Sequence, residues 1–529
     1  MIHFPIFANS SARLITISKK VKIRSALISV YYKTGLEPVL KALHENGVAL
    51  YATGGTYDFI QTLGYDVTAV EDVTHYPSIL GGRVKTLHPK IFGGILHRRN
   101  VLSDLEEINT YEIPAMDLVM VDLYPFEETV SSGASEDAII EKIDIGGVSL
   151  IRAAAKNFND VNIVCSPSDR QTFLQHYIEH KGETTLEMRR TLAANAFRLT
   201  SNYDFAIQKY FNPQENFLTD EISLHLNNRK QLRYGENPHQ QASYYGLLNE
   251  IFDHLSGKEL SYNNLLDCDA ALNLISEFKE EDGITIGIIK HNNACGLATR
   301  TSSAEAWKDA LAGDPVSAFG GIIVCNASID ATLAVEMKTL FFEILIAKDF
   351  TADALAILSE KKNRILLKLK LSVTNTVSIR SALNGYLVQT KDQDEMSADN
   401  WEFATTRKPI QQEISDMLFA NKIVRNLKSN AIVLAKNKQL LGIGAGETSR
   451  VDALKHAIAK AKHFGFNLNG AVMASDAFFP FPDCVEIAFN SEIEAVVQPG
   501  GSIKDKDSIA FCNKNNMTMV LTGKRHFKH

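Results

Sequence analysis

Cysteine is scarce in this chain, and its spacing excludes two classes of protein. Six cysteines occur in 529 residues, and no pair has the short C-x-x-C spacing of a zinc or redox site. A density this low also excludes a disulfide scaffold. The cysteines therefore fit a reducing compartment, and we expect a cytoplasmic protein.

Long apolar runs and a surplus of positive charge are missing as well. No stretch reaches the roughly 18 apolar residues of a membrane span, and residues 1–20 have only a short apolar patch without a cleavage site. We interpret residues 1–20 as an N-terminal extension. The net charge of -7 gives no global attraction to nucleic acid or acidic membranes, so we expect neither as a partner. Any bound anion must meet a local site.

The composition is that of a folded soluble protein with more than one core. Hydrophobic residues make up 45% of the 529 residues and charged residues 22%, and this length predicts two or three compact units. The segment from Phe211 to Glu221 is polar, contains a proline and has no periodicity. We therefore place a domain boundary there, between residues 21–220 and 221–529.

Short apolar runs alternate with helical periodicity in both halves, which predicts an α/β protein with a parallel sheet in the first domain. The runs of the first half are Ser25–Val30, Val48–Tyr51, Leu118–Leu123 and Val161–Cys165. Those of the second half are Ile284–Ile289, Gly321–Val324, Ala431–Leu434, Ala471–Met473 and Ala495–Val497. They fall in two groups, so we predict two subdomains there. No internal repeat is evident.

A glycine-rich tetrad, Thr53-Gly54-Gly55-Thr56, lies between a predicted strand and a predicted helix. Free backbone N–H groups, two hydroxyls and the helix dipole all favour an anion at such a junction. The tetrad therefore predicts a phosphate site, although a plain tight turn would need the same glycines.

The loop from Gly81 to Pro89 adds cations to the first half. It contains Arg83, Lys85 and Thr86 between a Gly-Gly pair and a His-Pro pair, which is typical of a ligand-holding loop. The alternative is a charged turn in solvent. Further on, Tyr124 follows a predicted strand and Asp144 precedes a helical run, and strand ends are where α/β proteins keep their chemistry.

The second half contains a lysine and a histidine that are adjacent in the sequence. Lys290 and His291 directly follow the apolar run Ile284–Ile289, which favours a functional pair over a structural histidine. The segment Gly442–Arg450 lacks both the Rossmann glycine spacing and a Walker lysine, so we discount a dinucleotide or ATP site. The aromatic, acidic loop Ser475–Asp483 could clasp a flat heterocycle or belong to a core.

These motifs, in this order, resemble the bifunctional purine biosynthesis family. The first half resembles its inosinate (IMP) cyclohydrolase domain, and the chain from about Leu232 to His529 resembles its formyltransferase domain. One departure is Tyr31-Tyr32, where many family members carry Ser-Asp. The motifs that carry the resemblance are TGGT, GGRVKTLHP, LYPF, IDIGG, RAAAKN, LRYGENPHQ, KHNNACG, GDPVSAFGG, KSNA, GIGAGETSR, SDAFFPFPD and QPGGSI.

The resemblance implies a methylglyoxal-synthase-like fold and ring closure for residues 21–220. The residues that it implies for ring closure are Lys85, Tyr124, Asp144 and Lys156. Those implied to hold the nucleotide and its phosphate are Ser29, Lys33, Thr53, Gly54, Gly55, Thr56, Arg83 and Thr86.

For residues 221–529 the resemblance implies two cytidine-deaminase-like subdomains and formyl transfer from 10-formyltetrahydrofolate to the aminoimidazole carboxamide ribonucleotide, AICAR. His291 would act as the base, Lys290 would stabilise charge, and Asn430 would lie near the formyl group. The implied nucleotide and substrate contacts are Arg233, Tyr234, Asn264, Arg450, Asp476, Phe478 and Arg525. The first domain would then close the formylated product, FAICAR, to IMP. A homodimer with formyltransferase sites between subunits is implied, and no metal is needed for the chemistry.

Two other functions fit the sequence less well. A zinc deaminase requires H-x-E and P-C-x-x-C ligands, which the sequence lacks. A phosphate-sensing regulatory module would need only the first domain, whereas Lys85 and Lys156 with Asp144, and a second catalytic domain, favour an enzyme.

Overall fold

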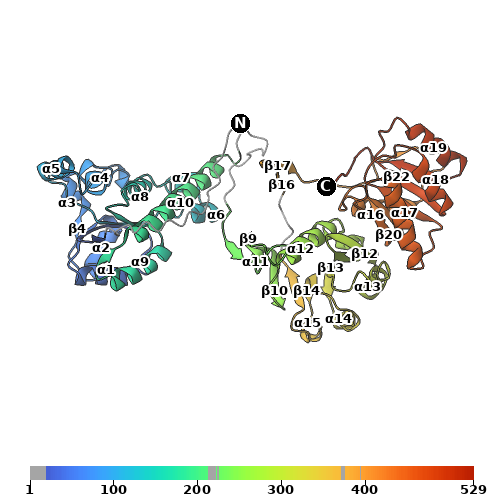
Figure 1. Cartoon of the computed structure of the whole chain (residues 1–529), viewed down its shortest axis with the longest axis horizontal. Coiled ribbons are helices and arrows are strands. Elements are labelled where there is room, and N and C mark those ends of the chain that lie inside the picture. The colour runs from blue at the N-terminus through green and yellow to red at the C-terminus, as the bar shows by residue number, and fades with distance from the viewer. Residues whose placement is uncertain (1–19, 213–221, 223–225, 371–375, 394) are drawn as a thin grey trace. The chain divides into compact units, whose positions relative to one another are not determined.

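The chain divides into two compact units: residues 1–219, the first unit, and residues 220–529, the second unit (Figure 1). The structure, a computed structural model, describes residues 20–212, 222, 226–370, 376–393 and 395–529. Within these ranges no helix is both long enough and apolar enough to cross a membrane. All six cysteines are free and buried. The predicted N-terminal extension lies almost wholly outside the described residues.

A five-stranded parallel sheet forms the centre of the first unit. The strands are, in spatial order, β4 (Thr68–Ala69), β3 (Ala49–Ala52), β2 (Ser25–Ser29), β5 (Leu118–Val121) and β6 (Asn162–Val164). The four apolar runs predicted as strands are confirmed as β2, β3, β5 and β6. Most of their side chains are apolar and buried because helices cover both faces of a parallel sheet.

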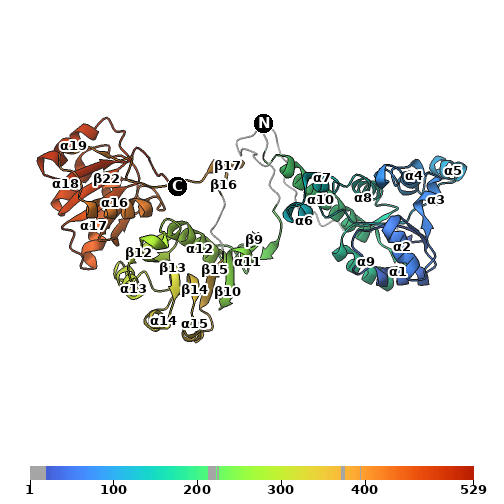
Figure 2. The same ribbon diagram turned by 180° about the vertical axis from the view of Figure 1, so that it is seen from behind.

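Helices α1 (Glu37–Glu45) and α9 (Pro167–Glu179) lie on one face of this sheet (Figures 1 and 2). Helices α4 (Pro89–Leu96), α8 (Gly146–Lys156) and α10 (Leu186–Phe211) pack together on the other face. The remaining elements are α2 (Gly54–Thr62), α3 (Val70–Thr74), α5 (Leu102–Thr110), α6 (Phe126–Ser131), α7 (Glu136–Ile140), a 3₁₀ turn (Leu80–Gly82) and the pair β1 (Val21–Lys22) and β7 (Glu183–Thr184).

The second unit is built on a twelve-stranded mixed sheet. Its spatial order is β10 (Phe252–Ser256), β15 (Ile365–Leu369), β14 (Ile344–Phe350), β13 (Ile322–Ile329), β11 (Ile284–Lys290), β12 (Asn293–Arg300), β20 (Gln439–Gly444), β19 (Ile432–Lys436), β21 (Ala471–Ser475), β22 (Ile493–Gln498), β23 (Thr518–Leu521) and β18 (Glu402–Phe403). The five apolar runs predicted here are confirmed as strands.

One strand topology occurs twice in this sheet. Hairpin β11–β12 is followed outward by the parallel strands β13, β14 and β15, and hairpin β19–β20 by the parallel strands β21, β22 and β23. An antiparallel strand closes each outer edge, β10 on one side and β18 on the other. The two copies meet where β12 pairs with β20.

Each copy has one helix on one face of the sheet and three on the other. Helices α12 (Tyr262–Ile275) and α16 (Gln411–Val424) share one apolar core beneath both copies. The opposite face is covered by α13 (Ser303–Ala312), α14 (Ala331–Met337), α15 (Ala352–Ser359), α17 (Arg450–His463), α18 (Asp483–Asn490) and α19 (Asp505–Lys514). The remaining elements are α11 (Leu248–Ile251), a 3₁₀ turn (Glu280–Asp282), the pair β8 (Arg229–Gln231) and β9 (Ser243–Tyr245), and the hairpin β16 (Val377–Ala382) and β17 (Gly385–Thr390).

Candidate active sites

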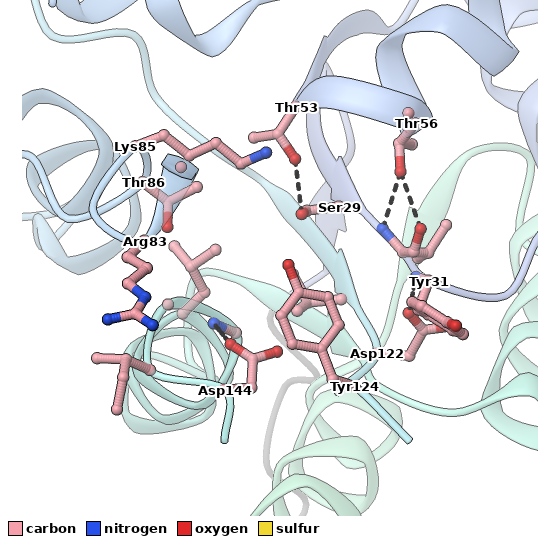
Figure 3. Close-up of a pocket in the computed structure, with 18 of the residues that line it drawn as sticks. Ser29, Tyr31, Thr53, Thr56, Arg83, Lys85, Thr86, Asp122, Tyr124 and Asp144 are labelled. Carbon is pink, nitrogen blue, oxygen red and sulfur yellow. Dashed lines mark hydrogen bonds between the residues drawn. The ribbon is translucent and has the colours of Figure 1, made fainter. Parts of the chain in front are cut away.

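A cavity of about 520 Å³ lies in the first unit, where strands β2, β3 and β5 end. The carboxyl ends of parallel strands meet at one edge, which is where open α/β sheets bind ligands. The cavity brings together most of the residues predicted for this unit (Figure 3). They are Ser29, Lys33, Thr53, Gly55, Thr56, Arg83, Lys85, Thr86, Tyr124 and Asp144.

Hydroxyl groups and a lysine gather at the start of α2. The Ser29 and Thr53 hydroxyls are 2.8 Å apart, and Lys33 Nζ donates to Thr56 Oγ1 at 3.0 Å. Burial lowers the pKa of Lys33. Because the first backbone N–H groups of a helix lack helical acceptors, this end of the cavity suits a phosphate.

The first glycine of the predicted Gly-Gly pair, Gly54, is favoured by its backbone conformation and by a close side chain. Gly54 has φ of 42°, and a Cβ there would lie 3.0 Å from Lys85 Nζ. A side chain would be strained in that backbone conformation and would also displace the lysine amine. Glycine therefore lets the cation approach the start of α2.

Lys85, Tyr124 and Asp144 surround the open centre of the cavity, with Ser29 and Thr53 at one end (Figure 3). Asp144 Oδ1 accepts the Gly147 N–H at 2.7 Å. Burial raises the pKa of the Asp144 carboxyl, and burial together with the nearby Asp144 raises the pKa of the Tyr124 hydroxyl. The arrangement supplies a cation, a neutral hydroxyl donor and a carboxylate of increased basicity.

A buried ion pair that the sequence did not indicate holds one wall of the cavity. Arg170 donates to Asp122 at 2.5 Å and to the Tyr32 and Thr34 carbonyls at 2.8 and 2.9 Å. Asp122 in turn accepts the backbone N–H groups of Tyr31 and Tyr32. Because the loop is held through its backbone, the Tyr31-Tyr32 departure leaves these contacts unchanged. The Tyr31 ring meets the Tyr124 ring edge-on at 5.9 Å.

Three other predicted residues have different surroundings. Arg83 is largely exposed and pairs with Glu141, which also lines the cavity. Thr86 Oγ1 lies 2.8 Å from the position that a Cβ on Gly146 would take, so that glycine gives the hydroxyl room. Lys156 does not line the cavity: it ends α8, about 15 Å along the helix from the end that does. Its role in ring closure stays a prediction.

In the second unit, Lys290 ends β11 and His291 begins a two-residue turn into β12. Lys290 Nζ donates to the Phe319 carbonyl at 2.7 Å, which joins it to the GDPVSAFGG loop. The His291 side chain is exposed. The structure therefore brings the lysine and the histidine to a hairpin tip, rather than to the open end of a parallel strand.

Asn264 is buried and has structural partners. Its side-chain oxygen accepts the Ser261 N–H at 3.1 Å within the capping box of α12, and its amide donates to Glu343 at 3.0 Å. A nucleotide contact by Asn264 would have to share or replace these bonds.

A second group of predicted residues lies around β19, β21 and the start of α17. Arg450 donates to Asp476 at 2.8 Å and to the Phe478 carbonyl at 3.2 Å, and Asn430 donates to the Glu447 carbonyl at 2.9 Å. Among the described residues, Arg450 Nε and Asp476 Oδ2 are buried without a hydrogen-bond partner. Such atoms are suited to a polar ligand.

The remaining predicted contacts lie in exposed segments. The Arg233 guanidinium stands 5.5 Å from the centre of the Tyr234 ring, and the Arg525 guanidinium 4.4 Å from that of Phe527. A cavity of about 390 Å³ in this unit contains none of the predicted residues; β9, α11 and β10 contribute to its lining. No group of His, Cys, Asp and Glu in the described ranges could hold a metal ion.

Comparison with known proteins agrees with both sets of motifs. The family model described as AICARFT/IMPCHase bienzyme matches residues 154–460, and one described as MGS-like domain matches residues 35–149. Bifunctional purine biosynthesis protein PurH of Bacteroides thetaiotaomicron is 58% identical over 97% of this chain and 100% of its own length. The proteins of that name from Caldicellulosiruptor saccharolyticus and Aquifex aeolicus are each 45% identical, over 96% and 95% of this chain and 100% of their own lengths. The chain belongs to the AICARFT/IMPCHase bienzyme family.

Membership in the bienzyme family confirms three predictions from the sequence: the family itself, the methylglyoxal-synthase-like fold of the N-terminal region, and the activity. The chain is a bifunctional enzyme of purine biosynthesis, an AICAR formyltransferase and IMP cyclohydrolase. Sequence reasoning missed Arg170, whose partners come from distant segments. Asp122 directly precedes the Leu-Tyr-Pro-Phe motif, but nothing in the sequence indicated its pairing with Arg170.

Proposed function

We propose that residues 21–220 close FAICAR to IMP and that residues 221–529 transfer the formyl group of 10-formyltetrahydrofolate to the 5-amino group of AICAR. The observation that carries the first assignment is the cavity where hydroxyls and a helix start face Lys85, Tyr124 and Asp144. The scattered, buried cysteines favour a reducing cytoplasm.

Ring closure requires the carboxamide nitrogen to attack the formyl carbon of the same nucleotide. Ionised Asp144 accepts the proton that the nitrogen loses, and Lys85 and Tyr124 donate to the oxygen on which negative charge develops. That oxygen takes up the protons lost by the carboxamide nitrogen and by the formamide nitrogen. The C–O bond then breaks, a C=N bond forms, and the oxygen leaves as water. The phosphate lies at the start of α2, against Ser29, Lys33 and the Thr53–Thr56 tetrad, and so fixes the reacting groups in place. Arg83 and Thr86 contact the substrate from the opposite loop.

Formyl transfer requires a better nucleophile than the aromatic amine of AICAR. His291 removes the amine proton as the nitrogen attacks the formyl carbon, and Lys290 stabilises the oxyanion that forms. The bond between the formyl carbon and the folate nitrogen then breaks, and that nitrogen takes the proton held by His291. Tetrahydrofolate leaves, and the formyl group stays on the nucleotide. Asn430 lies near the formyl group. The other contacts are Arg233, Tyr234, Asn264, Arg450, Asp476, Phe478 and Arg525, held by two cytidine-deaminase-like subdomains.

We also propose a homodimer with formyltransferase sites between subunits. One face of the hairpin β16–β17 carries Val377, Ile379, Tyr386 and Val388, and Tyr386 is 70% exposed. A hairpin alone is marginally stable, and an exposed apolar face is typical of a protein contact. The exposed positions of His291 and Arg233 are consistent with completion of the site by a second chain.

The dimer is tested by pairing two inactive variants. Because each site would draw residues from both chains, mixing His291→Ala with Arg450→Ala should restore up to about a quarter of formyl transfer if these residues belong to different chains of one site. Sedimentation velocity should show a dimer for the wild type. A monomer with full formyl transfer would contradict the proposal.

A fragment of residues 21–220 should close the ring alone, because every proposed ring-closing residue lies within it. The measurement is conversion of FAICAR to inosinate by the purified fragment. Full-length protein given AICAR and formyl folate, with tetrahydrofolate and inosinate both followed, is the reference. A fragment that folds but makes no inosinate would show that the domain assignment is wrong.

A further inference from the structure

The turn that carries His291 has an unusual backbone. His291 and Asn292 connect the paired residues Lys290 and Asn293, and their φ angles are 50° and 63°. Positive φ at both central residues is the type I′ hairpin geometry, which favours glycine or asparagine. A histidine at the first position is strained, so this turn needs an anchor outside itself.

Asp267, on α12, supplies such an anchor. Its Oδ1 accepts the Asn292 backbone N–H at 2.7 Å, inside the turn. The carboxylate is half-buried, and burial raises the pKa of Asp267 although the nearby Lys290 acts in the opposite direction. Asp267 follows Asn264 by three residues, so both lie on the side of α12 that faces β11 and the Glu343 carboxylate.

In the second copy of the strand topology, a helix aspartate also binds the backbone of a hairpin turn. In hairpin β19–β20, Asn437 and Lys438 have φ angles of 53° and 51°. Asp416 on α16 accepts both of their N–H groups, at 2.8 and 2.7 Å. Helix α12 begins at Tyr262 and α16 at Gln411, so Asp267 and Asp416 are each the sixth residue of their helices. A carboxylate at this helix position is therefore how the fold holds a strained hairpin turn.

We infer that Asp267 is a positioning residue for formyl transfer: by binding the Asn292 N–H it holds the turn that places His291. The inference rests on the proposed role of His291 as the base. Asp267 acts only through His291, without touching the substrate. Its contribution is to kcat, because a displaced base leaves nucleotide contacts intact while moving the proton acceptor.

Asp267→Ala should lower kcat for formyl transfer about 10- to 100-fold, the usual effect of moving a catalytic group by about an ångström. The KM for AICAR and the rate of ring closure should change little. Asp267→Asn keeps an acceptor oxygen and should retain transfer within about threefold of wild type, since only the charge assistance to the bond is lost. The matched control is Asp269→Ala, which removes an exposed carboxylate from the same helix and should transfer at the wild-type rate.

A double variant separates positioning from general damage to the fold. If Asp267 acts through His291, the variant His291→Ala/Asp267→Ala should transfer no more slowly than His291→Ala alone. Thermal unfolding should be measured on each variant. A well-folded Asp267→Ala with wild-type kcat, beside an inactive His291→Ala, would overturn this inference alone. So would an additive double variant, or an Asp267→Asn as slow as Asp267→Ala. Near-normal transfer by His291→Ala would remove the proposed base and this inference together.

Discussion

In the Asp144→Ala and Lys85→Ala variants, inosinate formation falls and FAICAR accumulates. Loss of the proton acceptor Asp144 should slow ring closure by roughly 10²- to 10⁴-fold. Loss of the Lys85 cation should cost roughly 10²- to 10³-fold, the usual effect of removing one donor to a developing oxyanion. Formyl transfer continues in both variants because its residues lie in the second unit. The measurement is the ratio of FAICAR to inosinate after incubation with AICAR and formyl folate.

The dependence of ring closure on pH checks the role of Asp144 separately. The base must be ionised, so the rate is present above its pKa and is lost as the pH falls through it. Because burial raises the pKa of Asp144, this loss should begin at a higher pH than for an ordinary aspartate, and Asp144→Asn should lack it. Asp137→Ala, which removes an exposed carboxylate from the adjacent helix α7, is the matched control. Unchanged inosinate output by both Asp144→Ala and Lys85→Ala would contradict the assigned roles.

Strand order explains why the first cavity could be predicted from the sequence. The residues that follow β2, β3 and β5 are far apart along the chain, but parallel strands bring their carboxyl ends to one edge. Thr53 and Tyr124 could therefore be grouped from apolar runs and the polar residues after them, whereas Ser29 was indicated only by the family resemblance. The Asp144→Ala and Lys85→Ala variants test the chemistry assigned to this cavity.

The ion pair between Asp122 and Arg170 shows what such reasoning misses. The two residues are separated by 48 positions, and neither stands in a pattern that indicates a buried pair. Removing one partner of a buried ion pair typically lowers the free energy of unfolding by about 3–5 kcal/mol. Even so, no local sequence pattern indicates this pair. Lys156 is the opposite case. It is close to Asp144 in the sequence, but helix α8 separates the two residues in space.

The apolar runs of the second unit indicated two subdomains, but the strand topology that the two share could not be read from any internal sequence repeat. Its two hairpin turns are His291-Asn292 and Asn437-Lys438, neither of which contains the glycine that signals a type I′ turn. Helices α12 and α16 share an aspartate at the sixth position but few other residues. Since strand pairing depends on apolar alternation rather than identity, two copies of a fold can lose their sequence similarity and keep their topology.

His291→Ala should lower formyl transfer by roughly 10²- to 10⁴-fold, the usual contribution of a positioned proton acceptor. Ring closure should survive, because no residue proposed for it lies beyond residue 220. His291 is exposed at a hairpin tip, so its replacement should leave thermal unfolding nearly unchanged, whereas loss of a buried structural histidine would lower it.

The measurements are thermal unfolding, AICAR affinity and both half-reactions on this one variant. His463→Ala is the matched control, because it removes another exposed histidine of the second unit, from the last turn of α17. A fold defect confined to the second unit would reduce nucleotide binding together with turnover, whereas loss of the base lowers turnover alone. Near-normal formyl transfer by a well-folded His291→Ala would mean that another residue accepts the amine proton.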